Sequence, residues 1–378
     1  MSATLAQRAL RKSLGQIRYV APVPPSAAEG LVAEVYAQVE HDFGMLAPPI
    51  ALHSPAAGPL AASWLMLRET LAVQGLASRA AKETVAAAVS LGNTCPYCVT
   101  VHNAVLGALD HRRDATALAD DHVESMGDPA LRDIARWARS SGQQAAAASG
   151  ALPFPADQLP ELAGVAMTFQ YLNRMVTVFL AESPLPSAVP APVAGGMMRM
   201  LGRLMRPAAL SGAQAGASLA LLPAAAQPEG APPADLRWSA RSPSIADAFA
   251  RAIAAIETAG ALAVPEPARE LVRGELARWD GQPRGLSRSW ADDMIAGLPA
   301  AARPAGRLAL LTAFAPHQVV QADIDEFRDG QAGDEQLVAL SSWASLAAAR
   351  RLAAWLSEAA GSAPEPGPVA QPGQGRQH

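Results

Sequence analysis

The chain has two cysteines, Cys95 and Cys98, and His102 follows the second of them by four residues. In a helix, these three side chains share one face. Two thiols one turn apart cannot join distant parts of a fold, so a framework of structural disulfides is excluded and redox or metal chemistry becomes the question. The thiolate is the reactive form of cysteine, and both a helix N-terminus and a nearby imidazole favour its formation.

The sequence around the cysteines predicts two helices joined by a tight turn. Gly92-Asn93 is a helix stop, and the run Thr94-Cys95-Pro96 is a helix start. If the helices fold back as a hairpin, Glu83 lies ~15 Å before the turn and His102 ~12 Å after it, at about 1.5 Å per residue. The carboxylate can then face the imidazole and hold its tautomer, as the third member of a catalytic triad does.

The composition favours helices along the whole chain. Alanine, leucine and arginine abound, aromatic residues make up only 5% of the chain, and no segment alternates with the two-residue period of a strand. Apolar residues recur at helical spacing over residues 29–43, 61–75, 80–91, 131–138 and 162–180. We therefore predict an all-α protein.

We predict two helical lobes joined by an irregular, Pro/Gly/Ala-rich linker. The expected units are an N-terminal arm at 1–22, a first lobe at 23–182, the linker at 183–242, a second lobe at 243–358 and a disordered tail at 359–378.

A weak internal repeat favours duplication of the lobes. Sliding the chain by 187 positions places Glu83 over Glu270 and Val85 over Val272, and residues 162–179 are echoed by 337–355. The second copy lacks the chemical residues, since the counterparts of Cys95, Cys98 and His102 are Gln282, Gly285 and Ser289.

Glu83, together with the Cys-x-x-Cys-x-x-x-His run from Cys95 to His102, resembles the signature of the AhpD-like alkylhydroperoxidase branch of the carboxymuconolactone decarboxylase superfamily. The resemblance extends more loosely over about residues 25–182 and includes Phe169 and Asn173-Arg174, and the second lobe resembles a degenerate copy. It implies an all-helical fold, a peroxidase that works through a dithiol–disulfide cycle, and assembly as trimers or hexamers. For a chain of two lobes we expect a homotrimer.

The resemblance also implies a role for each site residue. Cys98 attacks the hydroperoxide, Cys95 resolves the sulfenic acid as a disulfide, His102 relays the proton and Glu83 supports His102. Because Cys95 lies at the helix N-terminus, a thioredoxin-type argument would exchange the two cysteines. Some family members have histidine between the cysteines, where this chain has Tyr97, whose phenol is a poor base at neutral pH. The reductant would be a dithiol, on a lipoyl- or thioredoxin-like protein, and no cofactor is implied.

Other interpretations of the same residues are weaker. Cys-Pro-Tyr-Cys is also the glutaredoxin tetrapeptide, but there it follows a β-strand, whereas here an alanine-rich helical segment precedes it. A zinc site on one helix face would have three ligands where closed structural sites need four. The cysteines can also be buried small hydrophobes beside a satisfied histidine, and Glu83 an ordinary glutamate of a first helical turn. Lactone decarboxylation or a non-catalytic redox sensor are the alternative functions.

The charge distribution and hydropathy exclude several classes of protein. The net charge is −4 and no basic stripe is present, which argues against nucleic-acid binding. No signal peptide or membrane span is recognisable, so we expect a cytoplasmic protein. The segment 196–206 is cationic and amphipathic and can contact a membrane surface or a partner, although such segments more often lie on their own protein. His53, His111 and His122 lie off the pattern and are expected at the surface or in loops.

Overall fold

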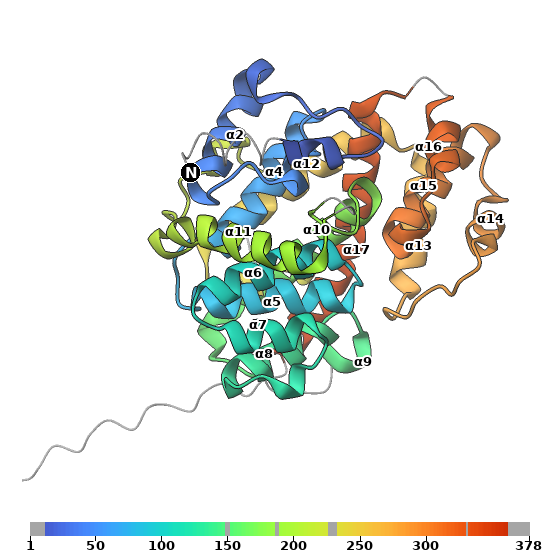
Figure 1. The fold of residues 1–378 in the computed structure, drawn as a ribbon. Coiled ribbons are helices and arrows are strands. Elements are labelled where there is room, and N and C mark those ends of the chain that lie inside the picture. Colours follow the sequence, from blue (N-terminus) through green and yellow to red (C-terminus); the bar gives the residue numbers. More distant parts are fainter. Residues whose placement is uncertain (1–11, 148–151, 186–188, 226–232, 330–331, 362–378) are drawn as a thin grey trace, which may run out of the picture.

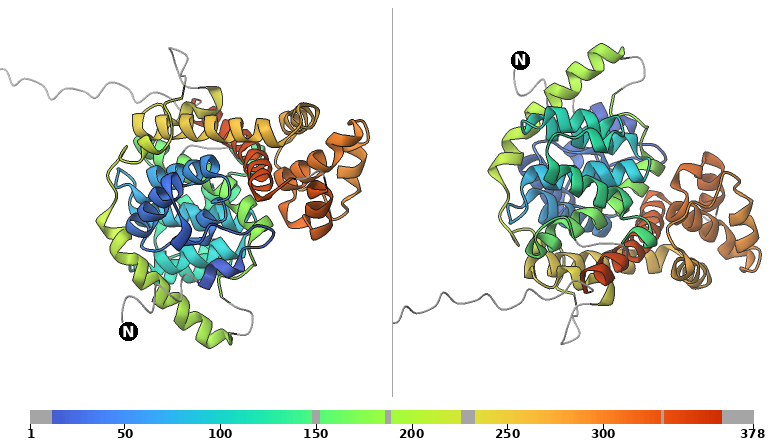
Figure 2. Two further views of the ribbon diagram at one scale, coloured as in Figure 1. Left: turned by 90° about the horizontal axis from the view of Figure 1, so that it is seen from above. Right: turned by 90° about the horizontal axis from the view of Figure 1, so that it is seen from below.

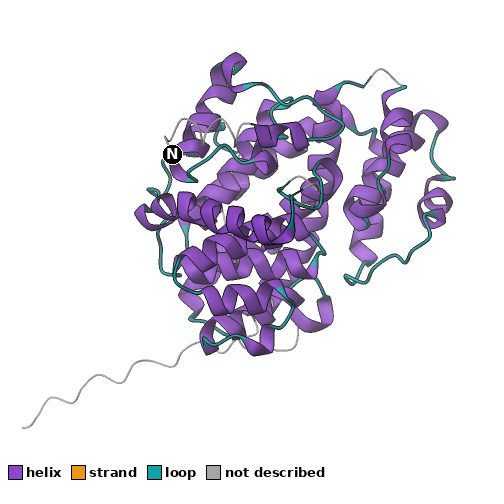
Figure 3. Ribbon diagram, viewed as in Figure 1, coloured by secondary structure: helices purple, strands orange, loops and turns teal. Residues whose placement is uncertain are grey.

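The computed structural model describes residues 12–147, 152–185, 189–225, 233–329 and 332–361. Every regular element in these ranges is helical and no strand occurs in them, apart from one isolated bridge between Val73 and Ala213 (Figure 3). The prediction of an all-α protein is therefore confirmed. No helix in the described part of the chain is both long and apolar enough to cross a membrane.

The helices of the first half are α2 (Gly30–Asp42), α3 (Pro48–Ala51), α4 (Ala57–Leu67), α5 (Arg79–Gly92), α6 (Pro96–Ala108), α7 (Arg112–Ala119), α8 (Pro129–Ser140), α9 (Gln144–Ala147) and α10 (Leu159–Phe179) (Figure 1). Those of the second half are α11 (Ala191–Ser211), α12 (Pro243–Ala263), α13 (Glu266–Arg278), α14 (Ser289–Ile295), α15 (Arg303–Phe314), α16 (Gln321–Arg328) and α17 (Asp334–Gly361). Short 3-10 segments lie between them, and a π-helical turn at Arg68–Ala72 continues α4.

Local sequence explains the hairpin of α5 and α6. The Ser78 hydroxyl accepts a hydrogen bond from the Ala81 N–H, and this cap begins α5. The helix ends at Gly92, where a Cβ atom would lie 2.5 Å from a carbonyl oxygen of α8. Thr94 then turns the chain with a φ of 53°, and Cys95 is the N-cap of α6. The predicted stop and start signals are thus found at the predicted positions.

A buried ion pair anchors the start of α5 to α10. The Nζ atom of Lys82 lies 2.5 Å from Oε2 of Glu161 and donates to the carbonyl of Val73. Burial lowers the pKa of Lys82 although the Glu161 carboxylate opposes this shift. Oε1 of Glu161 also accepts the N–H of Leu76. The pair therefore fixes the loop that precedes α5.

The two lobes share one hydrophobic core. α4 packs against α12, and α10 packs along α17, while α13, α14, α15 and α16 extend to one side (Figures 1 and 2). α4 of the first lobe corresponds to α12 of the second, since each directly precedes the helix that the repeat aligns, α5 or α13. α10 corresponds to α17, because their sequences resemble each other. Each pair therefore joins equivalent helices, which is the arrangement of an isologous dimer interface.

The expectation of an irregular linker at 183–242 is wrong over much of its length. Residues 191–211 form the 21-residue helix α11, which packs against α6, and the 3-10 segment Ala234–Ser239 buries Trp238 in the core. Proline and glycine are common there, but Pro190 lies before the helix, where a missing N–H costs no intrahelical hydrogen bond, and the interior Pro207 removes only one. Most of the expected disordered tail, residues 362–378, lies outside the described residues.

Candidate active site

Glu83 and His102 meet across the α5–α6 hairpin. Oε2 of Glu83 lies 2.7 Å from Nδ1 of His102, and both residues are buried. A carboxylate can only accept a hydrogen bond, so Nδ1 carries the proton. The Nε2 atom of His102 is then the ring nitrogen that can take up or release a proton. The sequence-based expectation that these side chains face each other agrees with this geometry.

A third residue completes this chain of contacts. The Nε atom of Arg79, one turn before Glu83 on α5, lies 2.7 Å from Oε1 of Glu83. Burial alone would raise the pKa of Glu83, but the positive charges of Arg79 and His102 and their hydrogen bonds outweigh it, so the pKa lies below its ordinary value. Glu83 therefore stays ionised. Arg79 was not among the residues predicted from the sequence, although its i,i+4 spacing to Glu83 is a recognisable signal.

Cys95 and Cys98 are both buried, unbonded thiols. A hydrogen bond with the Cys98 thiol is the main cause that lowers the pKa of Cys95; burial opposes it, and the backbone N–H of Cys98 supports it. The same hydrogen bond, together with burial and the negative charge of Cys95, raises the pKa of Cys98 well above its ordinary value. Of the two thiols, Cys95 is therefore the more acidic, and Cys98 is the one that holds its proton more strongly.

A largely apolar cavity of about 550 Å³ lies beside Cys98 and His102. Cys98 is part of its wall, whereas Cys95 is not. Phe169 of α10 also lines it and packs its ring edge-on against His102, with the ring centroids 4.6 Å apart. On the other side the cavity is closed by α11, through Met197, Met198, Met200, Leu201 and Leu204. Access therefore favours Cys98 as the sulfur that meets a substrate.

Tyr97 also lines the cavity, at the position where some relatives have histidine. Burial and the charges of the two cysteines raise the pKa of its phenol far above the ordinary value. Tyr97 therefore remains protonated and cannot act as a base, as its residue type already indicated.

A polar network lies behind Cys95 and connects the site to the second lobe. Asn173 donates to the Ser90 hydroxyl, and Asn93 donates to Asn173 at 2.9 Å. Arg174, which is buried and follows Gln170 by one turn of α10, donates to the Gln170 carbonyl and, from Nε at 2.9 Å, to the Ala313 carbonyl of α15. Burial lowers the pKa of Arg174 to about 10. The second lobe thus supports the back of the site.

The second lobe lacks a comparable site in its equivalent positions. α13 begins where the 187-residue shift of α5 places it, but the counterpart of α6 is helical only over α14. Gln282 and Gly285 therefore lie in a loop, and Ser289 is the first residue of α14. These three residues and Glu270 are all exposed.

His53 lies in the turn between α3 and α4, which agrees with the sequence-based expectation of a loop residue, but it is not at the surface. It is completely buried, its Nε2 lies 2.8 Å from the Tyr171 hydroxyl, and its Nδ1 contacts the Ile50 carbonyl. Burial lowers the pKa of His53 to about 4, so it is neutral at pH 7. His122 is exposed and His111 partly so. Within the described residues, no group of three or more His, Cys, Asp or Glu side chains is arranged to hold a metal ion.

Comparison with known proteins gives one extensive sequence match. The chain is 37% identical over 345 residues to the alkyl hydroperoxide reductase of Mycobacterium tuberculosis, and the alignment covers 91% of this chain and 96% of that protein. No family model matches the chain. Among solved structures, an uncharacterized peroxidase-related protein from Ralstonia eutropha JMP134, described as an alkylhydroperoxidase AhpD core, is 18% identical with a TM-score of 0.39, covering 50% of this chain and 97% of that one.

Proposed function

The chain belongs to the AhpD-like alkyl hydroperoxide reductase family, and from this premise we propose that it reduces organic hydroperoxides through a Cys95/Cys98 dithiol–disulfide cycle. The observation that carries the proposal is that Cys98 and His102 line one apolar cavity, with Cys95 hydrogen-bonded behind the first and Glu83 behind the second.

In the first step, the Cys98 sulfur attacks the terminal oxygen of the hydroperoxide and the O–O bond breaks. The Cys98 proton passes to the Cys95 thiolate along their hydrogen bond, so the anion forms on the sulfur that faces the cavity. The departing alkoxide takes a proton from protonated His102 and leaves as an alcohol. The Glu83 carboxylate stabilises the imidazolium that supplies this proton.

In the second step, the Cys95 sulfur attacks the sulfenic acid on Cys98. A disulfide forms, and the sulfenic hydroxyl leaves as water with the proton that Cys95 had received. An external dithiol then reduces the disulfide by thiol–disulfide exchange; of its two protons, one stays on Cys98 and the other returns to His102, so Cys95 is again the thiolate. One hydroperoxide and one dithiol are consumed for each alcohol and each water produced. A lipoyl- or thioredoxin-like protein is the expected class of reductant.

The position of the charge explains why Cys98 can react although its pKa is raised. The two thiols share one proton over a hydrogen bond, so the tautomer with the anion on Cys98 is reached without release of a proton to solvent. A hydroperoxide in the cavity meets Cys98 and not Cys95. The tautomer with the anion on Cys98 can therefore react with the hydroperoxide, although it is the less stable of the two.

A peroxide-consumption assay tests the proposal. The purified chain with dithiothreitol should consume tert-butyl hydroperoxide over many turnovers, and Cys98→Ser should not. One stoichiometric oxidation without turnover would instead support a redox sensor. Inactivity toward peroxide with decarboxylation of a carboxymuconolactone would support the alternative chemistry of the superfamily.

A further inference from the structure

The helix that covers the cavity has an exposed apolar stripe. Val193, Met197, Met200 and Leu204 follow one another at three- and four-residue spacing on α11 and are 53%, 43%, 41% and 40% exposed. Such spacing places them in a single line along one helix face. α11 lies at the edge of the body, on the side away from α12 (Figure 2). A continuous apolar line at the surface is typical of an interaction site.

Two arginines lie beside this stripe. Arg199 and Arg203 are exposed on α11, one turn apart, and neither forms an ion pair with any residue that the structure describes. Arg206, one turn further along, is paired with Asp110. Helical spacing places the two unpaired arginines roughly a quarter to a third of a turn around the helix from the stripe, between it and the face that packs on α6. The exposed side of α11 therefore combines an apolar line with uncompensated positive charge.

The inner side of α11 is fixed to the active-site helix. A Cβ atom at Gly202 would overlap the carbonyl oxygen of Ala104 on α6, so only glycine permits this close approach. Met197, Met200 and Leu204 belong to the exposed stripe and to the cavity wall at once. The cavity beside Cys98 therefore extends to the stripe, and an apolar chain that contacts the stripe is next to the cavity.

We propose that α11 docks on an anionic lipid surface and that the substrates are hydroperoxides of lipid acyl chains. Apolar side chains of an interfacial helix insert among acyl chains, and arginines beside them attract anionic headgroups. The stripe and the pair Arg199 and Arg203 fit this combination. An oxidised acyl chain then passes along Met197 and Met200 toward Cys98. The redox steps are those of the proposed function, on which this inference rests, and the product is a lipid alcohol.

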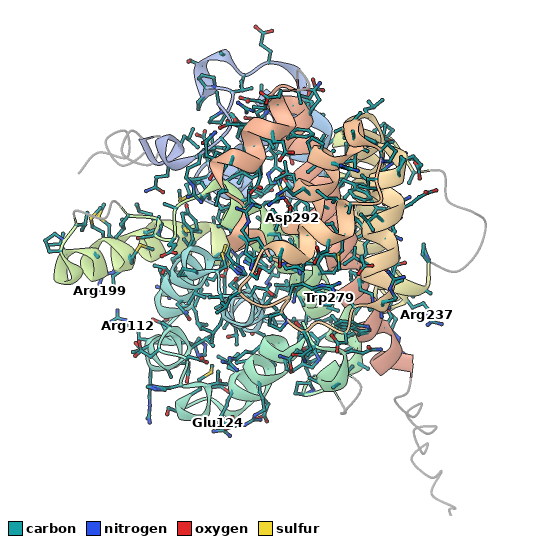
Figure 4. The ribbon with its side chains drawn as sticks, turned by 90° about the vertical axis from the view of Figure 1, so that its right-hand side faces the viewer. Arg112, Glu124, Arg199, Arg237, Trp279 and Asp292 are labelled. Atoms are coloured by element: carbon teal, nitrogen blue, oxygen red, sulfur yellow. The ribbon has the colours of Figure 1, made fainter. Side chains whose placement is uncertain are left out.

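Vesicle sedimentation tests the docking. The full chain should sediment with vesicles of phosphatidylglycerol and phosphatidylcholine and much less with phosphatidylcholine alone. The double variant R199E/R203E should lose at least about tenfold in partitioning. The matched control is R237E/R241E, two exposed arginines without an ion pair in the described chain, of which Arg237 lies on the opposite side from Arg199 (Figure 4). The control should sediment as the wild type does.

Turnover tests the substrate class. With dithiothreitol as reductant, R199E/R203E should lower the ratio of phospholipid-hydroperoxide turnover in anionic vesicles to tert-butyl hydroperoxide turnover at least about tenfold. Equal sedimentation with both vesicle types, or equal loss in both double variants, would overturn the inference while leaving the proposed function intact. Sedimentation that depends on Arg199 and Arg203, without turnover of either peroxide, would support docking and overturn the proposed function.

Discussion

Oε2 of Glu83 lies 2.7 Å from Nδ1 of His102, so a carboxylate on α5 orients the imidazole on α6 across the hairpin turn. Glu83→Gln should lower hydroperoxide turnover by about 10- to 100-fold, part of the about 10²- to 10⁴-fold that a positioned acid contributes. The amide retains the shape of the side chain and removes the charge that stabilises the imidazolium. Steady-state kinetics at pH 7 measures the loss, and an unchanged rate would contradict the role of Glu83.

The same substitution should also reduce stability. It leaves the Arg79 charge next to a neutral group in a buried site, at a cost of about 2 kcal/mol at pH 7. The pKa of Glu83 is lowered on folding, so its contribution is present above the unfolded pKa of about 4.3 and is lost as the pH falls through the folded pKa. The free energies of unfolding of wild type and variant, measured with urea, should therefore differ at pH 7 and become equal in acid. The control Glu270→Gln, at the exposed equivalent position, should change stability by less than about 0.5 kcal/mol.

The thiol pair should ionise more readily than an ordinary cysteine. Because the Cys98 thiol is the main cause that lowers the pKa of Cys95, the ultraviolet absorbance of thiolate should rise at a pH below about 8.5. Turnover should then fall as the pH is lowered through the pKa of the pair, since the reaction needs one negative charge. Cys98→Ala should move the absorbance change to higher pH. If the absorbance rises at the same pH in Cys98→Ala as in the wild type, another group stabilises the thiolate.

The sequence was sufficient to predict the hairpin because its signals are local. The stop at Gly92, the start at Pro96 and the i+4 spacing of Cys98 and His102 all act within a few residues of the groups that they position. The helical class followed from composition in the same way, since an alanine-rich chain with few β-branched residues favours helices throughout.

The features that were missed depend on contacts distant in sequence. The buried His53 is satisfied by Tyr171 of α10, whose hydroxyl donates to Nε2 because Nδ1 donates to the Ile50 carbonyl, and nothing near His53 in the sequence indicates this contact. Arg174 is satisfied by the Ala313 carbonyl of the other lobe. For α11, the high proline and glycine content of the segment led to the prediction of a linker. A helical signal was nevertheless present, since Met197, Met200 and Leu204 recur at helical spacing. The cavity could not be predicted without placing α11 over α6.

The equivalents of the site residues in the second lobe should be dispensable. Gln282→Ala and Ser289→Ala change exposed side chains and should leave turnover within about twofold of wild type. Gly285 has a φ of 84°, so Gly285→Ala should cost about 1 kcal/mol of stability without a loss of turnover. Turnover and urea unfolding measured together separate the two effects. A large loss of rate with unchanged stability would mean that the second lobe contributes to the chemistry.

The chain should assemble as a homotrimer if each two-lobe chain replaces two subunits of a hexameric single-lobe relative. The pairing of α4 with α12 and of α10 with α17 inside one chain is consistent with such a replacement. Light scattering coupled to size-exclusion chromatography should then give three times the mass of 39.0 kDa. A monomer across the concentration range would contradict the expectation and leave the intrachain pairing unaffected.

The two sulfurs should have different roles in peroxide reduction. Cys98 lines the cavity and Cys95 does not, whereas the lowered pKa belongs to Cys95. If access to the cavity decides which sulfur reacts first, Cys98→Ser abolishes peroxide reduction. Cys95→Ser reacts once, more slowly because serine cannot take up the Cys98 proton, and accumulates a sulfenic acid on Cys98 that a dimedone-type reagent traps. His102→Ala should slow the reaction at least about 100-fold at pH 7, because the alkoxide then leaves without a positioned acid. Mass spectrometry of the trapped adduct decides: an adduct on Cys95 in Cys98→Ser would mean that acidity outweighs access and that the roles of the two cysteines must be exchanged.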